Sequence, residues 1–76
     1  MSESVKIVEE ICEITVSDYK PQEKLQDVLR WDSFAILNFM AQAENQYHYH
    51  LTVEDMVEVE TIEELIRLLD EKRQEE

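Results

Sequence analysis

The 76-residue chain contains no glycine, a single proline and a single cysteine. The absence of glycine excludes the glycine-rich loops that cradle nucleotide phosphates, and it leaves turns to Asn, Asp, Ser and Pro. Cys12 cannot form a disulfide within the chain, and its apolar helical surroundings predict a small core residue in a reducing cytoplasm. No stretch approaches the length of a membrane span, and the first five residues lack the basic start and apolar run of a signal peptide.

Basic residues are also scarce, since 7 lysines and arginines face 19 aspartates and glutamates and the net charge is -12. Such a charge repels nucleic acid and anionic membranes and favours basic protein surfaces. A chain of this length predicts one domain over residues 1–76, too small to enclose a deep catalytic cleft of its own. We therefore expect a monomeric module that works with other proteins and is not itself an enzyme.

Residues 33–43 carry no ionisable side chain, although acids are scattered through most of the sequence around them. This segment is expected to be the central helix, and its apolar residues fall into two stripes at helical spacing. The first stripe comprises Ile36, Met40, Ala43 and Tyr47, and the second comprises Phe34, Leu37 and Ala41. One stripe can face a core, whereas the other needs a different partner, either elsewhere in the chain or outside it.

The residues at the start of this helix indicate where an anion could bind. Asp32 is a favourable N-cap residue, which places the Ser33 hydroxyl in the first turn among backbone N–H groups without helical partners. A phosphate group suits that position.

Two further helices are predicted at the ends of the chain. The first has one apolar face, formed by Ile7, Val8, Ile11, Ile14 and Thr15; Ser2 or Ser4 is expected to cap it, and it should end near Ser17 and Asp18. Its β-branched residues also suit a strand, but the apolar spacing is nearer 3.6 than 2 and favours the helix. In the last helix, Thr61 and Glu64 match a capping box, and Ile62, Leu65, Ile66 and Leu69 form the inward stripe. The residues from Asp70 onward should fray.

Between these helices we expect connecting segments. Residues 19–30 should form a loop whose Leu25, Val28 and Leu29 lie on the core. A helix end and a turn follow in residues 45–50, Leu51 is an apolar anchor, and residues 53–57 predict one or two helical turns. The predicted fold class is thus all-α, a small bundle of three main helices plus a short helix before the last.

The run Asp32-Ser33-Phe34, followed by Leu37, Glu44 and Tyr47, resembles the Asp-Ser-Leu motif and second helix of acyl carrier proteins, and the likeness covers nearly the whole chain. The resemblance implies that the predicted bundle is acyl-carrier-like. It implies that Ser33 carries 4'-phosphopantetheine, transferred from coenzyme A by a phosphopantetheinyl transferase. The arm would hold acyl intermediates as thioesters for acyl-loading and acyl-using enzymes of a fatty-acid, polyketide or specialised acyl or aminoacyl pathway. The chain departs from the family where Arg30-Trp31 replaces the glycine that commonly precedes the Asp-Ser pair.

The resemblance also implies two surfaces. Partner enzymes with basic or apolar docking patches would contact Asp32, Phe34, Leu37, Asn38, Ala41 and Glu44. An acyl chain would be sheltered among Ile36, Met40, Ala43, Met56, Val59, Ile62 and Leu65, although plain core packing explains these seven residues more simply. Because Ala35, Asn38, Ala41 and Gln42 replace most acids of the family's docking face, a specialised carrier is indicated.

Other chemistry has little support in the sequence. His48 and His50 lack a third ligand at recognisable spacing, so we expect exposed turn residues and no metal site. No serine–histidine–acid grouping can be assembled from them. The alternative function is an unmodified acidic helical protein-interaction domain that docks through Phe34 and Leu37, with Ser33 serving only as part of the helix start.

Overall fold

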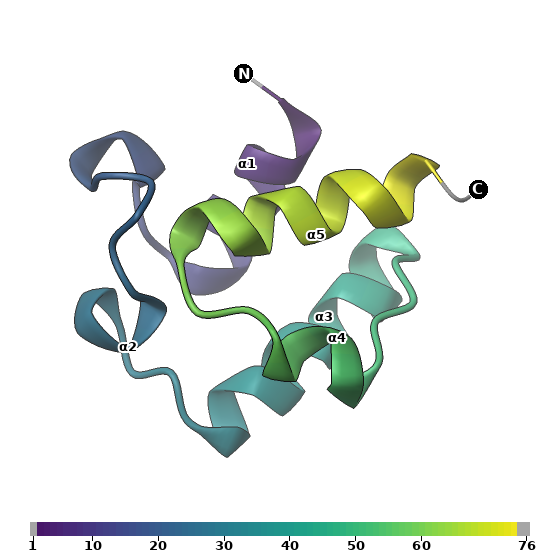
Figure 1. The fold of residues 1–76 in the computed structure, drawn as a ribbon. Helices are drawn as coiled ribbons and strands as arrows, with labels where there is room; N and C mark the ends of the chain where they lie inside the picture. The colour runs from purple at the N-terminus through teal and green to yellow at the C-terminus, as the bar shows by residue number, and fades with distance from the viewer. Residues whose placement is uncertain (1, 75–76) are drawn as a thin grey trace.

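The computed structural model describes residues 2–74, which fold into five α-helices and one 3-10 helix, η1 (Figure 1). Their bounds are α1 Glu3–Cys12, η1 Val16–Asp18, α2 Leu25–Val28, α3 Ser33–Tyr47, α4 Val53–Val57 and α5 Ile62–Gln74. Helix α1 packs against both α3 and α5, and the connection that carries η1 and α2 lies along one side of the bundle. The predicted all-α bundle is confirmed, with two short elements that were not expected.

The core is formed by apolar side chains from all five α-helices, from the segment between α3 and α4 and from the connection between α4 and α5. Its buried members are Ile7, Val8, Leu25, Phe39, Ala43, Tyr49, Leu51, Met56, Val59, Ile62, Leu65, Leu68 and Leu69. Phe39 was not expected there, yet it is 1% exposed and its ring meets Trp31 edge to face, with centroids 6.0 Å apart. Trp31 thereby anchors the chain just before α3.

The prediction that the first helix continues to Ser17 and Asp18 is wrong. Helix α1 ends at Cys12 because Glu13 adopts a left-handed conformation with φ 58°. The β-branched residues that follow suit extended backbone, and the N–H of Val16 donates to the Glu9 carboxylate at 2.8 Å. At the other end, the Ser2 hydroxyl accepts a hydrogen bond from the N–H of Val5, which makes Ser2 the cap.

The segment expected to be a plain loop, residues 19–30, contains helix α2, so that prediction is corrected. Leu25 is fully buried and Val28 and Leu29 are half-buried, which confirms that these three residues lie on the core. The N–H of Leu25 donates to the carbonyl of Glu60 at 2.9 Å, and the N–H of Ile62 donates to the carbonyl of Glu23 at 3.1 Å. These bonds fix the connection against the start of α5.

Helix α3 is the longest element and ends where the sequence predicts a helix end and turn. His48 has φ 64° and its N–H donates to the carbonyls of Ala43 and Glu44, which closes the helix. The buried Tyr49 and Leu51 that follow bring the chain back to the core. Leu51 is thus confirmed as the expected anchor.

The two C-terminal helices begin with capping boxes. In α4, whose bounds match the prediction, Thr52 and Asp55 cap each other's backbone, and in α5 Thr61 and Glu64 do the same. Helix α5 continues to Gln74, so the prediction that the chain frays from Asp70 onward is wrong for residues 70–74. Residues 75 and 76 lie outside the described part of the chain. Asp70 accepts a hydrogen bond from the buried Ser4, and Lys72 pairs with Asp55 at 3.0 Å, which holds this last stretch to the bundle.

Candidate functional site

The first turn of α3 displays a serine hydroxyl at a helix entrance. Asp32 is the N-cap, and its Oδ1 accepts a hydrogen bond from the N–H of Ala35 at 2.9 Å. Ser33 is the first residue of the helix, its side chain is exposed, and its hydroxyl has no hydrogen-bond partner within the described part of the chain. Among residues 2–74, none accepts a bond from the N–H groups of Ser33 and Phe34. An exposed hydroxyl beside two unpaired donors fits a phosphate ester.

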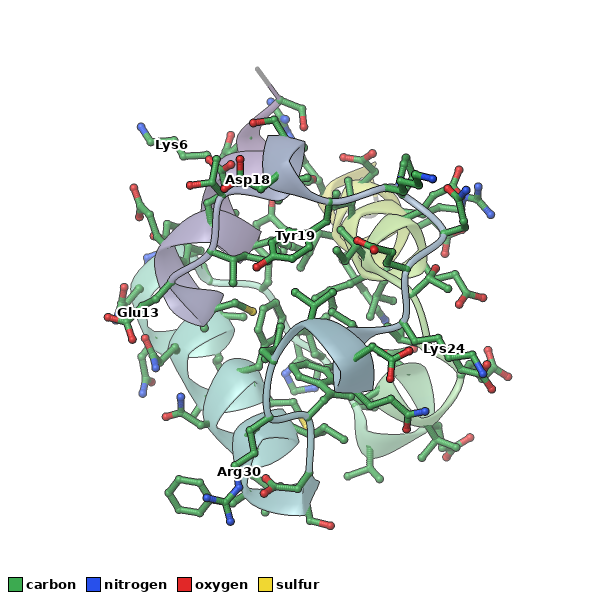
Figure 2. All side chains as sticks on the ribbon, turned by 90° about the vertical axis from the view of Figure 1, so that its left-hand side faces the viewer. Lys6, Glu13, Asp18, Tyr19, Lys24 and Arg30 are labelled. Atoms are coloured by element: carbon green, nitrogen blue, oxygen red, sulfur yellow. The ribbon has the colours of Figure 1, made fainter. Side chains whose placement is uncertain are left out.

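The charge at this turn is fixed by two contacts. The N–H of Ala35, together with the Arg30 side chain, holds the pKa of Asp32 below its ordinary value of 3.8. Arg30 reaches the second carboxylate oxygen through Nε at 2.9 Å and lies beside the start of α3 (Figure 2). Asp32 is therefore ionised at neutral pH and stays engaged as the cap.

The residues predicted for partner docking lie along one face of α3. Phe34 is 81% exposed and Leu37 is 58% exposed, while Asn38, Ala41 and Glu44 are also exposed and Asp32 is half-buried. The second stripe could have found its partner within the chain by packing against Leu25, Val28 and Leu29, but Phe34 and Leu37 are not among the residues that pack on the core. The helix therefore presents an apolar strip to the solvent next to Ser33.

Helix α4 adds two residues that the sequence reasoning missed. Val53 is 59% exposed and Val57 is 73% exposed, while Met56 of the same helix is buried. The sequence carries no clear signal for this exposure, because Val53 lies three residues from the buried Met56 and so neighbours it on the helix surface.

The residues predicted to shelter an acyl chain all contact or belong to the core. Ala43, Met56, Val59, Ile62 and Leu65 are buried, whereas Ile36 and Met40 are half-buried and pack against the buried cluster. They come from three elements, α3, α4 and α5, and from the connection that holds Val59. In this conformation they are packed as core, so a guest chain would have to displace contacts among them.

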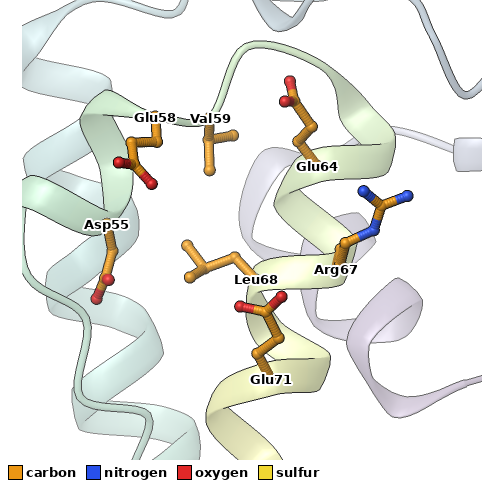
Figure 3. Close-up of a pocket in the computed structure, with 7 residues that line it drawn as sticks. All are labelled: Asp55, Glu58, Val59, Glu64, Arg67, Leu68 and Glu71. Carbon is orange, nitrogen blue, oxygen red and sulfur yellow. The ribbon is translucent and has the colours of Figure 1, made fainter.

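A groove of about 200 Å³ lies between α4 and α5 (Figure 3). Its lining comprises Asp55, Glu58, Val59, Glu64, Arg67, Leu68 and Glu71. Val59 is the one predicted acyl-pocket residue among them, and the charged side chains make this groove unlike an apolar acyl shelter.

The two histidines lie as expected. His48 and His50 are exposed, and His50 approaches Glu44 at 3.9 Å. Within residues 2–74, no group of three histidine, cysteine or acidic side chains is placed to hold a metal ion. No helix in the same range is long and apolar enough to cross a membrane.

Comparison with known protein families gives a match. Residues 5–69 match the family model described as a phosphopantetheine attachment site, which spans α1 to most of α5 and includes the first turn of α3. The comparison with curated proteins gives no match.

Proposed function

Because a match over residues 5–69 covers most of the chain, the protein belongs to the phosphopantetheine-binding family of carrier domains, and we propose that Ser33 is its attachment residue. Members of this family carry covalently attached 4'-phosphopantetheine and are not enzymes. The observation that supports Ser33 is its exposed, unpartnered hydroxyl at the entrance of α3. The other serines are less suited to attachment of the group, since Ser2 is a helix cap, Ser4 is buried and Ser17 lies in η1.

Attachment is a transfer reaction in the active site of a separate phosphopantetheinyl transferase. The Ser33 hydroxyl oxygen attacks the phosphorus of coenzyme A that bears the pantetheine. A serine–phosphate bond forms, the phosphoanhydride bond breaks, the nucleotide half of coenzyme A leaves, and the hydroxyl proton passes to a base that the transferase provides. The positive end of α3 then faces the new phosphodiester and stabilises it by roughly 0.3–1 kcal/mol.

The attached group supplies a terminal thiol, which holds an acyl group as a thioester and delivers it to partner enzymes at high effective concentration. The protein's own part is to position the attachment point and to present surfaces beside it. Asp32, Phe34, Leu37, Asn38, Ala41 and Glu44 are the proposed docking residues, and the seven core residues described above are the proposed acyl shelter.

The uncharged face of α3 supports a specialised carrier over one that serves the usual fatty-acid synthase partners. Ala35, Asn38 and Gln42 offer no carboxylate to a basic patch. We place this carrier in the cytoplasm as a monomer, supported by the free thiol of Cys12 and by a net charge of -12 that opposes self-association.

The proposal is tested by incubating the purified chain with coenzyme A and a broad-specificity phosphopantetheinyl transferase and measuring its intact mass. The wild-type chain should gain one phosphopantetheinyl group, and Ser33→Ala should gain none. Ser17→Ala is the matched control, because Ser17 is also exposed, and it should be modified like the wild type. An unmodified wild-type chain would favour the interaction-domain alternative and contradict the proposal.

A further inference from the structure

Two inward-facing side chains attach helix α4 to the rest of the bundle. The other three of its five residues, Val53, Glu54 and Val57, are exposed. Met56 is buried in the core, and the carboxylate of Asp55 pairs with Lys72 of α5 at 3.0 Å. Within residues 2–74, no backbone hydrogen bond joins α4 to another helix. One methionine and one ion pair therefore hold this short helix in place, and a helix of five residues is not stable alone.

The Asp55–Lys72 pair is the least exposed of the ion pairs formed within residues 2–74, since 23% of the Asp55 side chain and 22% of the Lys72 side chain are exposed. Such partial burial reduces the screening that weakens exposed pairs. Asp55 also accepts a hydrogen bond from the N–H of Thr52 at 3.0 Å. This N–H, and then Lys72, hold the pKa of Asp55 below its ordinary value of 3.8. The carboxylate is therefore ionised at neutral pH.

The surroundings of the pair are acidic. Asp55 and Glu58 lie on the α4 side of the groove between α4 and α5, and Glu71 lies on the α5 side (Figure 3). Without the Lys72 ammonium group, the Asp55 carboxylate would face like charge across the groove, and like charges repel. Lys72 therefore supplies attraction between two helices whose facing side chains are otherwise largely acidic.

We infer that the Asp55–Lys72 ion pair is a latch, which keeps α4 closed on α5 and whose release lets α4 leave the core while the other helices stay packed. Helix α4 carries Met56 and leads to Val59, which are two residues of the proposed acyl shelter. Release of the latch would open that wall of the shelter. The control of acyl access thus rests on the proposed function, whereas the latch itself does not.

Amide hydrogen exchange of the unmodified chain, followed by NMR, tests the latch. The N–H groups of Met56 and Val59 each donate to a carbonyl of this segment at 3.2 Å and report on α4. Lys72→Met keeps the apolar stem and removes the charge, so exchange at both sites should become about three- to tenfold faster. Lys72→Arg keeps the charge and should stay within about twofold of the wild type.

Two controls separate a local opening from general destabilisation. Arg73→Met removes the neighbouring charge of α5, which pairs with Glu3 of α1 at 3.5 Å, and should leave exchange at Met56 unchanged. In low concentrations of urea, exchange at Met56 should depend weakly on urea, because opening of α4 exposes little surface. Exchange at Leu65, which lies in the core of α5, should depend on urea more steeply.

The control of acyl access is tested on the modified chain, with the arm loaded with either an acetyl or a medium-chain acyl group. Hydroxylamine cleaves an accessible thioester, and a guest chain drawn into the core withdraws its thioester from the reagent. Because Lys72→Met removes the cost of releasing the latch, the medium-chain thioester of this variant should be cleaved about two- to fivefold more slowly than that of the wild type. The acetyl thioester, whose chain is too short to reach the core, should be cleaved equally in both.

The outcomes are distinguishable. Exchange at Met56 that ignores Lys72→Met, or that follows urea as steeply as exchange at Leu65, overturns the latch. Faster exchange together with equal cleavage of the medium-chain thioester overturns its control of acyl access. A wild-type chain that never gains the arm overturns the proposed function, and the exchange measurements on the unmodified chain still decide the latch.

Discussion

Phe34 and Phe39 lie five residues apart on α3, yet the first is 81% exposed and the second is 1% exposed. The two rings project to different sides of the helix, since five residues turn it by about 500° and leave the side chains roughly 140° apart. One ring closes the core against Trp31 and the other faces the solvent beside Ser33. Phe39 therefore belongs to the core, whereas Phe34 belongs to the solvent-exposed surface of the same helix.

Replacing each ring with alanine should have very different effects on the free energy of unfolding. Phe39→Ala should lower the free energy of unfolding by about 3–5 kcal/mol, because it removes buried apolar contacts and leaves a cavity. Phe34→Ala should change it by no more than about 0.5 kcal/mol, as expected for an exposed site. Urea unfolding followed by circular dichroism measures both values. Equal costs for the two variants would show that the burial described here is wrong.

The cap of α3 should make stability depend on pH in the acid range. The folded pKa of Asp32 is lower than its ordinary value of 3.8, first through the N–H of Ala35 and then through Arg30. Its contribution is therefore complete above that ordinary value and is lost as the pH falls through the folded pKa. Asp32→Asn keeps a capping side chain but does not titrate, so its stability should fall less steeply with acid.

This prediction is measured by urea unfolding across a series of acid pH values. Asp27→Asn is the control, since it removes one exposed carboxylate without removing a helix cap that the structure shows. If Asp32→Asn and the wild type lose stability in parallel, the ionised cap is not part of what holds α3.

Cys12 should be an unreactive thiol in the folded protein. Burial raises its pKa to about 11, from an ordinary value of 9.0, so at neutral pH the folded chain has roughly a hundredfold less thiolate than the unfolded chain. Alkylation by iodoacetamide should accordingly be much slower without urea than with it. Because the unfolded thiol ionises first, stability should also decline as the pH rises above about 9. Equal alkylation rates in the two states would contradict this assignment.

The acyl-shelter proposal is tested by NMR. Attachment of a medium-chain acyl group to the arm should shift the signals of Met40, Met56 and Leu65, because a guest chain would replace contacts among these core residues. Ile7 and Val8 of α1 provide internal controls, since they are buried in the same core but were not assigned to the shelter. Shift changes confined to the surface around Ser33 would mean that the seven residues serve only as core.

Much of the fold is readable from local patterns. The Thr61 and Glu64 capping box, the Asp32 cap and the apolar spacing of the three long helices predict elements that the structure contains. The errors concern features that local patterns do not decide. The left-handed conformation of Glu13 ends α1 early, and helix α2 is one turn long and depends on the burial of Leu25.

Some features of the candidate site around Ser33 were also predictable from the sequence, and others were not. The position of Ser33 at the helix start follows from the sequence, because an N-cap fixes the first turn. The two apolar stripes predict that one of them needs a partner other than the core, but they do not decide whether Phe34 and Leu37 are covered within the chain. The role of Phe39 was missed because it lies beside the first stripe, on the side away from the second, and its ring packs against Trp31, a residue of the preceding connection. The exposure of Val53 and Val57 was missed because a helix of five residues has too little periodicity to assign its faces.

The most direct test of the central claim locates the modification within the chain. Trypsin should release residues 31–67 as one peptide, in which Ser33 is the single serine. After incubation with coenzyme A and transferase, tandem mass spectrometry should find the phosphopantetheinyl group on Ser33 of this peptide. A modified chain whose added mass lies on another residue, or a chain that gains no mass, would contradict the account.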